Sequence, residues 1–258
     1  MSNQESKRTE QKPFRPFLEL VKVEGKLALR EPTGIAFGVG LPVILLIIFG
    51  SVPAFGKTLP GTTFTLFDVY IPILMVTVLI MIGLLGLPIP VVRDREIGWL
   101  RRISTTPMAP SRLLAAQVTI NLILAAVGFV ILGAGSILIF GVKIMFEIPG
   151  FVLSIVLATA AMFSLGLLIA AIAPSQGAAG GMATAFLYPL LFFAGVYVPT
   201  QVLPSSLQKI SSLTPVGAAV KALNSSMSGS FPSLVPLLVM AAYTAFFSFI
   251  AVRYFRWE

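Results

Sequence analysis

The residues of this sequence that carry reactive groups are few. Among its 258 residues the chain has no cysteine and no histidine. A disulfide or a thiolate metal site is therefore excluded, and the side chain that most often acts as acid or base near neutral pH is missing. We expect no catalytic residue, no metal site and no cofactor in this chain.

One stretch resembles a phosphate-binding loop. Such a loop needs four residues between its first glycine and the Gly-Lys-Thr triplet, because its backbone N–H groups wrap the phosphates. Here Gly50 and Gly56-Lys57-Thr58 enclose the five residues SVPAF, one of which is proline. The spacing predicts that ATP does not bind here.

The stretch REIGWLRRISTTPMAP, residues 95–110, lies between two long apolar tracts and carries three arginines and a glutamate. Hydrophobic residues make up 57% of the chain and charged residues only 11%, against about 25% charged in soluble domains. The net charge of +8 does not indicate a nucleic-acid partner, because the basic residues lie between apolar runs and not on a soluble face. The composition predicts an integral membrane protein.

A membrane-crossing helix needs about 20 mostly apolar residues. The predicted fold is therefore all-α, with a transmembrane domain at 32–252. Six segments meet the length requirement: 33–52, 67–90, 113–141, 149–172, 180–198 and 232–252. The outer loop at 199–231 contains LPSSLQKI and TPVGAAVKAL, which we expect to form two short helices, the second with Thr214 as its N-cap and Pro215 at its first position.

The distribution of Lys and Arg predicts the orientation of these spans, since cytoplasmic loops are enriched in both. The chain has 18 such residues, and only Lys57, Lys143, Lys209 and Lys221 lie in the three connections we assign to the outside. The polar tail at 1–16 has no apolar signal-peptide core. We therefore expect this tail, the loop at 91–112 and the end at 253–258 to be cytoplasmic.

The segment FLELVKVEGKLALRE, residues 17–31, precedes the first span. Its apolar residues fall on one side of a helix and Lys22, Lys26 and Arg30 on another, which favours an amphipathic helix at the membrane interface. The alternative is a simple basic flank of the first span. Glu24 and Glu31 lie on the apolar side, and we expect them to face arginines of the cytoplasmic loop.

No Asp, Glu, Lys or Arg lies in the middle of a predicted span. Ion-driven carriers commonly place an ionisable group there to bind the coupling ion. The pattern argues against such a carrier and against a charged ion pore. Gln117 and Asn121, one helical turn apart, are interpreted as forming hydrogen bonds between helices.

Small-residue pairs at Gly34/Gly38 and Gly177/Gly181 allow close helix contact, either within the chain or between subunits. Aromatic residues in the fifth span contact lipid, pack internally or line a path for lipophilic cargo. The candidate residues for a substrate path or subunit interface are Gly34, Gly38, Phe186, Tyr188, Phe192, Phe193 and Tyr197.

With no ion and no ATP site, energy must come from another chain. The stretch REIGWLRRIS has apolar anchors beside basic residues, as expected of a short helix that docks in a groove of a soluble partner. We expect it to run over 96–104, before the prolines at 107 and 110.

This stretch is similar to the segment between the second and third spans of type-2 ATP-binding-cassette exporter permeases. The shared residues are Glu96, Gly98, Leu100, Arg102, Ile103, Thr106, Pro107, Ser111, Arg112, Leu113 and Leu114. A second stretch, FFAGVYVPTQVLPSSLQKISSLTPVGAAVKAL, resembles the fifth-span exit and outer helices of the same family, with Pro199, Leu203, Pro204, Ile210 and Pro215 in order. The sequence departs from the family at Trp99, where a small hydroxyl residue is common, and at Arg101, where an acid is common.

The resemblance implies a permease subunit that pairs with a second permease, identical or homologous, and with two cytoplasmic ATPases that hold ATP and Mg. ATP-driven closure would move cargo outward between the first, second and fifth spans of the two halves. Replacing Glu96 or Gly98 is expected to uncouple transport without preventing assembly. The residues implied to couple to the ATPase are Arg95, Glu96, Ile97, Gly98, Trp99, Leu100, Arg101, Arg102, Ile103, Thr106, Pro107, Glu24 and Lys26.

The apolar spans favour lipophilic drugs or lipids as cargo, and the resemblance extends to the antibiotic-resistance subgroup. It also implies a prokaryotic plasma membrane as location. Polysaccharide or glycolipid export by a related permease is an alternative, since aromatic rings also stack on sugars. A non-transport scaffold that binds anionic membrane lipid is another.

Overall fold

The computed structural model describes residues 14–30, 34, 36–58, 65–98, 111–142 and 146–255. These residues form helices joined by short connections, with an isolated β-bridge between Thr58 and Thr65, so the all-helical class is confirmed. The α-helices are α1 (Phe14–Arg30), α3 (Leu41–Ser51), α4 (Leu66–Met81), α5 (Pro88–Glu96), α7 (Ser111–Leu138), α8 (Ile148–Ile172), α9 (Gln176–Ala194), α10 (Ser205–Leu213), α11 (Pro215–Met227) and α12 (Leu234–Tyr254). Two π-helical segments, η1 (Ala36–Gly40) and η3 (Ile82–Gly86), precede α3 and α5, and the 3₁₀ turns are η2 (Pro53–Gly56) and η4 (Thr200–Val202).

Five helical segments of the described chain are long and apolar enough to cross a membrane: Leu66–Glu96, Arg112–Leu138, Ile148–Ile172, Gln176–Ala194 and Leu234–Tyr254. The segment Ala36–Ser51, at the predicted first span, is apolar but shorter. The chain is thus a multi-pass helical protein. A sixth crossing remains a prediction that depends on this short first segment.

The helix bounds differ from the predicted spans where local chemistry moves the ends. The helix predicted at 180–198 runs instead from Gln176 to Ala194, because the Ser175 side chain accepts a hydrogen bond from Ala178 N and Gly195 ends the helix at φ 90°. The helix predicted at 67–90 continues to Glu96.

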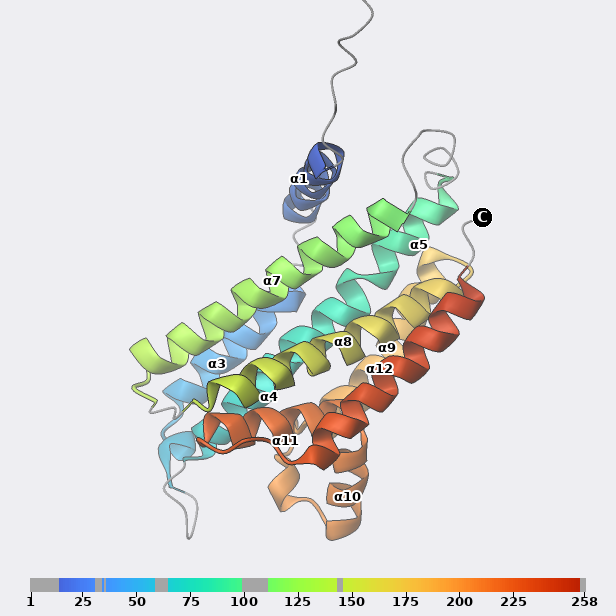
Figure 1. Cartoon of the computed structure of the whole chain (residues 1–258). Helices are drawn as coiled ribbons and strands as arrows, with labels where there is room; N and C mark the ends of the chain where they lie inside the picture. The colour runs from blue at the N-terminus through green and yellow to red at the C-terminus, as the bar shows by residue number, and fades with distance from the viewer. Residues whose placement is uncertain are drawn as a thin grey trace, which may run out of the picture.

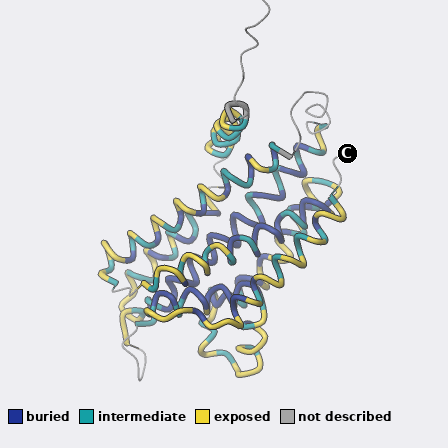
Figure 2. The backbone as a smooth tube through the Cα atoms, in the orientation of Figure 1, coloured by how far each residue is buried: buried dark blue, intermediate teal, exposed yellow. Residues whose placement is uncertain are grey.

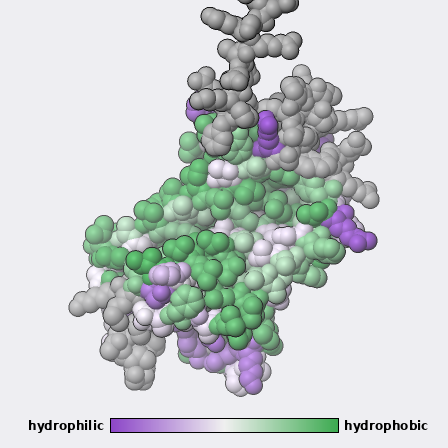
Figure 3. Space-filling view, viewed as in Figure 1, coloured by the Kyte–Doolittle hydropathy of each residue, from purple (hydrophilic) through white to green (hydrophobic). Residues whose placement is uncertain are grey.

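The bundle has two distinct ends (Figure 1). α1, the end of α5 and the end of α12 lie at one end, and α10 and α11 lie at the other. We call the first the basic end, because it carries Lys22, Lys26, Arg30, Arg93, Arg95 and Arg253. In the view of Figure 3 the sides of the bundle are hydrophobic and the hydrophilic residues gather toward the ends.

Helix α4 is the centre of the bundle (Figure 2). Every residue from Tyr70 to Met81 is buried, whereas α12 and α7 face outward along much of their length. At η3 the chain approaches α8 so closely that a Cβ on Gly83 would lie 3.0 Å from the Met162 carbonyl oxygen. A Cβ on Gly166 would overlap the carbonyl oxygen of Gly83, so both glycines are required by this contact.

The π-helical segments share a sequence feature. η1 ends at Gly40 and is followed by Leu41-Pro42, and η3 ends at Gly86 and is followed by Leu87-Pro88. Proline lacks the N–H that would continue the α-helical hydrogen bonds, and its ring clashes with the carbonyl of the preceding turn. A wider π turn just before each proline relieves this clash. The two segments contact each other at the side of α4.

The short helices expected in the outer loop are present. Thr214 caps α11 by accepting a hydrogen bond from Gly217 N at 3.1 Å, and Pro215 occupies its first turn. α11 is largely buried against α8 and α12, whereas α10 is mostly exposed. α11 therefore dips into the bundle.

Helix α1 packs on α7 with one face. Phe17, Leu20, Val21 and Ala28 are partly buried on this face, as the amphipathic pattern predicts, whereas Leu27 is exposed. On the polar side Lys22 hydrogen-bonds to Glu19 at 2.8 Å and lowers the pKa of Glu19. The remaining exposed apolar residues of α1, Leu18, Val23 and Leu29, suit a helix that lies at a lipid interface.

The Gly83–Gly166 contact makes a prediction about stability. Gly166→Ala places a methyl group on the Gly83 carbonyl oxygen and should destabilise the fold by about 1–3 kcal/mol, which lowers the melting temperature in detergent. Gly180→Ala, also helical but with no atom within 4 Å of the added Cβ, is the matched control and should not lower it. Equal melting of the two variants would contradict the packing described here.

Candidate functional site

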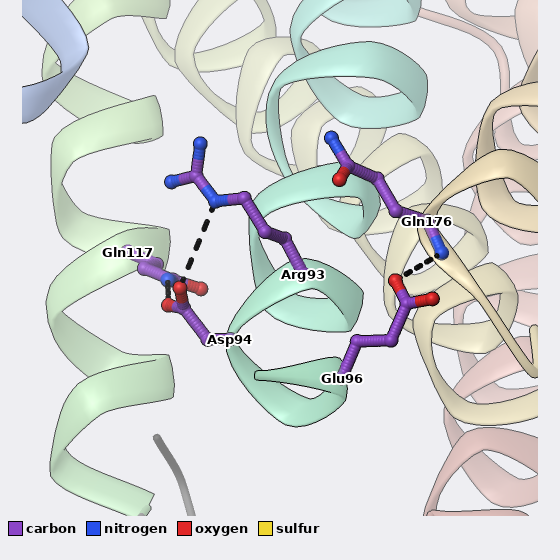
Figure 4. A network of polar contacts seen from close by, with 5 residues as sticks. All are labelled: Arg93, Asp94, Glu96, Gln117 and Gln176. Carbon is purple, nitrogen blue, oxygen red and sulfur yellow. Dashed lines mark hydrogen bonds and ion pairs between the residues drawn. The ribbon is translucent and has the colours of Figure 1, made fainter. Parts of the chain in front are cut away.

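The last turn of α5 carries four consecutive charged residues, Arg93, Asp94, Arg95 and Glu96. Successive residues of a helix point about 100° apart, so four in a row face different neighbours. Figure 4 shows Asp94 directed to Gln117 of α7 and Glu96 directed to the backbone of Gln176, at the start of α9. We call these four residues and their partners the α5 hub.

Asp94 joins α5 to α7. Its Oδ2 accepts a hydrogen bond of 2.9 Å from Gln117 Nε2, and its Oδ1 lies 3.9 Å from Arg93 Nε. Asp94 is 9% exposed and Gln117 5% exposed. A carboxylate this buried needs such partners, because an unpaired one would be strongly unfavourable.

Arg95 and Glu96 hold the turn between α8 and α9. Arg95 donates to the carbonyl oxygen of Ala170, in the last turn of α8, at 3.2 Å, and to that of Ala173, the residue that follows α8. Glu96 Oε2 accepts from Gln176 N at 2.9 Å, in the first turn of α9. A cation thus lies at a helix C-terminus and an anion at a helix N-terminus, and the helix dipole stabilises both charges.

A cavity of about 280 Å³ opens beside the hub, between α1, η1, η3, α5 and α7. Its polar lining comprises Glu24, Arg93, Gln117 and Asn121. The rest of its wall is apolar or glycine and includes Leu27, Phe37, Ile82, Leu85, Gly86, Ile120 and Leu124. The cavity is therefore amphipathic, with the charged groups supplied by α1 and α5.

Residues predicted to couple to an ATPase fall into two groups. Arg95, Glu96, Ile97 and Gly98 are described, and Trp99, Leu100, Arg101, Arg102, Ile103, Thr106 and Pro107 lie outside the described residues. The docking helix expected at 96–104 does not begin at Glu96, because Glu96 is the last residue of α5 and Gly98 adopts φ 71°, a left-handed conformation that stops a helix. Ile97 is 71% exposed, as an apolar anchor for a partner would be.

The two α1 residues of the same prediction differ in position. Glu24 lines the cavity together with Arg93, which agrees with the expectation that it faces the arginines of the loop. Lys26 is exposed and borders an apolar groove between α1 and α7. Glu31, the second acid of that expectation, lies outside the described residues.

The residues predicted to form a substrate path or subunit contact are not all together. Gly38 packs within the chain, since its Cβ would lie 3.0 Å from Ile82, whereas Gly34, Gly177 and Gly181 have no atom within 4 Å of an added Cβ. On α9 an exposed stripe follows helical spacing, Gly177, Gly181, Thr184 and Tyr188. Phe186 and Tyr197 are also exposed, and the Phe192 and Phe193 rings pack together at 5.4 Å.

Sequence reasoning missed part of the hub. It predicted that Gln117 and Asn121 form hydrogen bonds between helices. This is confirmed for Gln117, which bonds Asp94 of α5, whereas Asn121 donates to the carbonyl oxygen of Gln117 in its own helix. It did not anticipate Asp94 or Gln176. The signal was the run RDRE directly after an apolar span, since a charge that close to a buried helix must find a partner.

A family model described as "ABC-2 type transporter" matches residues 15–228 of this chain, from α1 to the end of α11. No curated protein matches the chain. The matched range includes the α5 hub, the cavity and the exposed stripe of α9.

A double-mutant cycle tests the bond between α5 and α7. Asp94→Ala and Gln117→Ala should each destabilise the protein, and their effects should be non-additive by about 1–3 kcal/mol, because both remove the same charged hydrogen bond. Thermal or denaturant unfolding in detergent measures this coupling. Asp94→Ala combined with Thr119→Ala, a change on the same helix α7 where Thr119 bonds only its own helix, should be additive. Additivity in both pairs would mean that the Asp94–Gln117 bond contributes nothing.

Proposed function

The chain belongs to the ABC-2 type transporter family and is therefore the permease of an ABC transporter, and on this premise we propose that it exports lipophilic drugs or lipids, powered by a separate cytoplasmic ATPase. Permeases of this family generally work with such an ATPase. The proposal includes two ATPase copies, a second permease that is identical or homologous, and a prokaryotic plasma membrane with both termini in the cytoplasm.

The observation that carries the proposed mechanism is the α5 hub. Residues 99–110 follow α5 in the chain after Ile97 and Gly98, so force applied to them by a docked ATPase would reach Asp94, Arg95 and Glu96 first. These residues contact α7, the end of α8 and the start of α9. A shift of α5 is therefore passed to three helices at once, as a rigid-body movement requires. No chemical step occurs in this chain; ATP and Mg belong to the ATPase.

The cargo path is proposed along α9. This helix is the least hydrophobic of the long apolar helices, and a third of its apolar window is buried in the chain. Its exposed stripe of two glycines, a threonine and a tyrosine leaves room and offers both polar and aromatic contacts. α4, predicted to take part in the path, is buried by its own chain, so α9 offers the more accessible surface.

Polysaccharide or glycolipid export is the second candidate. Tyr188 and Tyr197 are 60% and 54% exposed, and exposed tyrosines beside a threonine also suit sugar rings. Membership in a transporter family argues against the non-transport scaffold.

Co-purification tests the partner directly. Extraction of the chain from its native membrane in mild detergent, followed by mass spectrometry, should identify a stoichiometric soluble ATPase with its own phosphate loop. A preparation that retains known membrane complexes but yields no ATPase would contradict the proposal. The same measurement shows whether one or two kinds of permease are present.

Replacement of Glu96 tests the coupling role. Glu96→Ala removes the acceptor for Gln176 N and should lower transport at least tenfold, roughly the worth of one charged hydrogen bond, while the ATPase still co-purifies. Glu96→Gln keeps an acceptor oxygen and should lose less. Lys209→Ala, on the exposed α10 at the opposite end, is the control. Normal transport by Glu96→Ala would remove the hub from the mechanism.

A bulky residue on α9 tests the cargo path. Gly181→Trp fills open space within the stripe and should stop efflux of cargo from vesicles, measured separately with a lipophilic dye, a fluorescent phospholipid and a glycan-linked lipid. Ala241→Trp, at an exposed position of α12, should have no effect. The probe whose efflux is lost identifies the cargo class. Unchanged efflux of all three in Gly181→Trp would exclude α9 as the path.

A further inference from the structure

The amphipathic cavity beside the hub continues into an apolar groove. Ala28, Ile120 and Leu124 line both the cavity and the groove between α1 and α7. The groove adds Val21, Leu29 and Ile123 to this wall, with Lys22 and Lys26 at its border. The combined space therefore has a polar head between α1, α5 and α7 and an apolar tail along α7.

The polar head has an unused acceptor. Gln117 uses its Nε2 to bind Asp94, and its Oε1 is buried without a hydrogen-bond partner among the described residues. A buried amide oxygen without a donor is unfavourable, so this position favours a ligand that supplies one. Asn121 places a second amide oxygen in the wall, at the position where a Cβ on Gly86 would come within 2.7 Å of Oδ1.

The charges of the head are of both signs. Glu24 enters from α1 and Arg93 from α5, and both line the cavity. A zwitterionic group with a donating cation and an acidic phosphate complements this pair and the Gln117 oxygen. The guanidinium of Arg93 suits the phosphate, and the oxygens of Glu24 and Gln117 suit an ammonium.

The polar part of the cavity lies at the level in the bilayer where a lipid headgroup would be. Gln117 lies within about two helical turns of the start of α7 at Ser111, near the boundary between headgroups and acyl chains when α7 spans a bilayer. From there the groove leads along α7 past Ile120 to Ile123, which is 49% exposed. An acyl chain in this groove would remain continuous with the surrounding lipid.

We propose that the cavity and the α1–α7 groove form a binding site for one glycerophospholipid with a hydrogen-bond-donating amine headgroup, such as phosphatidylethanolamine, taken from the leaflet at the basic end. The lipid bridges α1 to α5 and α7, and α5 and α7 are among the helices that the ATPase is proposed to move. The site is separate from the exposed stripe of α9 and does not depend on the identity of the cargo.

The binding test compares two lipids that differ only in the headgroup amine. The full-length chain is stripped of lipid in detergent and titrated with dioleoyl phosphatidylethanolamine or dioleoyl phosphatidylcholine, and bound lipid is counted by native mass spectrometry. One ethanolamine lipid should bind per chain, with the choline lipid about tenfold weaker, because its quaternary ammonium donates no hydrogen bond. Equal binding of the two lipids would overturn the headgroup assignment.

Variants locate the site. Ile120→Trp fills the wall shared by the cavity and the groove and should abolish the tight binding, whereas Leu122→Trp, an exposed position of α7 outside both linings, should retain it. Gln117→Met should weaken ethanolamine-lipid binding about tenfold; if loss of its bond to Asp94 prevents folding, Ile120→Trp alone decides. Equal binding by the two tryptophan variants would overturn the site.

Competition with a headgroup that lacks acyl chains tests whether the site binds a lipid or a soluble molecule. Glycerophosphoethanolamine should not compete with the lipid at equimolar concentration, because it leaves the apolar groove empty. Competition at equal concentration would overturn the role of the groove and indicate a soluble ligand instead. These measurements use no ATPase and no transport assay, so their failure and the failure of the proposed function are distinguishable.

Discussion

The charged last turn of α5 must find partners for its side chains next to an apolar helix bundle, and the arrangement of the basic end depends on this requirement. Asp94 is buried and Arg95 is half-buried, so water cannot fully solvate them, and both form hydrogen bonds with neighbouring helices. Glu96 is exposed but also accepts a hydrogen bond from the start of α9. Two of these neighbours, the end of α8 and the start of α9, have free backbone groups that need partners themselves. One helical turn therefore ties α7, α8 and α9 together.

The π-helical turn before α5 shapes the space beside the α5 hub. The π turn of η3 relieves the clash caused by Pro88 and brings Gly83 against α8, while Gly86 leaves room for Asn121 of α7. The matching π turn of η1 adds Phe37 to the same region. The amphipathic cavity lies beside the α5 hub and is lined by residues of both π turns. Structural irregularity and polar contacts thus occur on the same segment that a partner at the basic end would move.

The exposed side chains on the outer surface of the bundle differ in kind from helix to helix. α7 and α12 present large apolar side chains, as expected for helices that face lipid. α9 instead presents a stripe of glycine, threonine and tyrosine, beside the exposed Phe186. A surface of small and amphipathic residues suits contact with a second subunit or with cargo better than contact with acyl chains. The proposed permease mechanism therefore has three separate parts: the α5 hub at the basic end, the proposed lipid site beside α1, and the proposed exchange surface along α9.

Sequence alone determined the membrane class, the positions of the long apolar helices and the short helices of the outer loop, because hydrophobic length and capping residues act locally. It also identified the segment around Glu96 and Gly98 by its resemblance to a family. It did not determine that Glu96 ends α5, that Asp94 pairs with Gln117, or that Gly83 meets Gly166. These facts depend on which helices become neighbours, and residues separated by 23 to 83 positions in the chain meet only after the bundle has packed. The cavity is likewise a product of tertiary structure, since its walls come from five separate elements and no local pattern specifies the space between them.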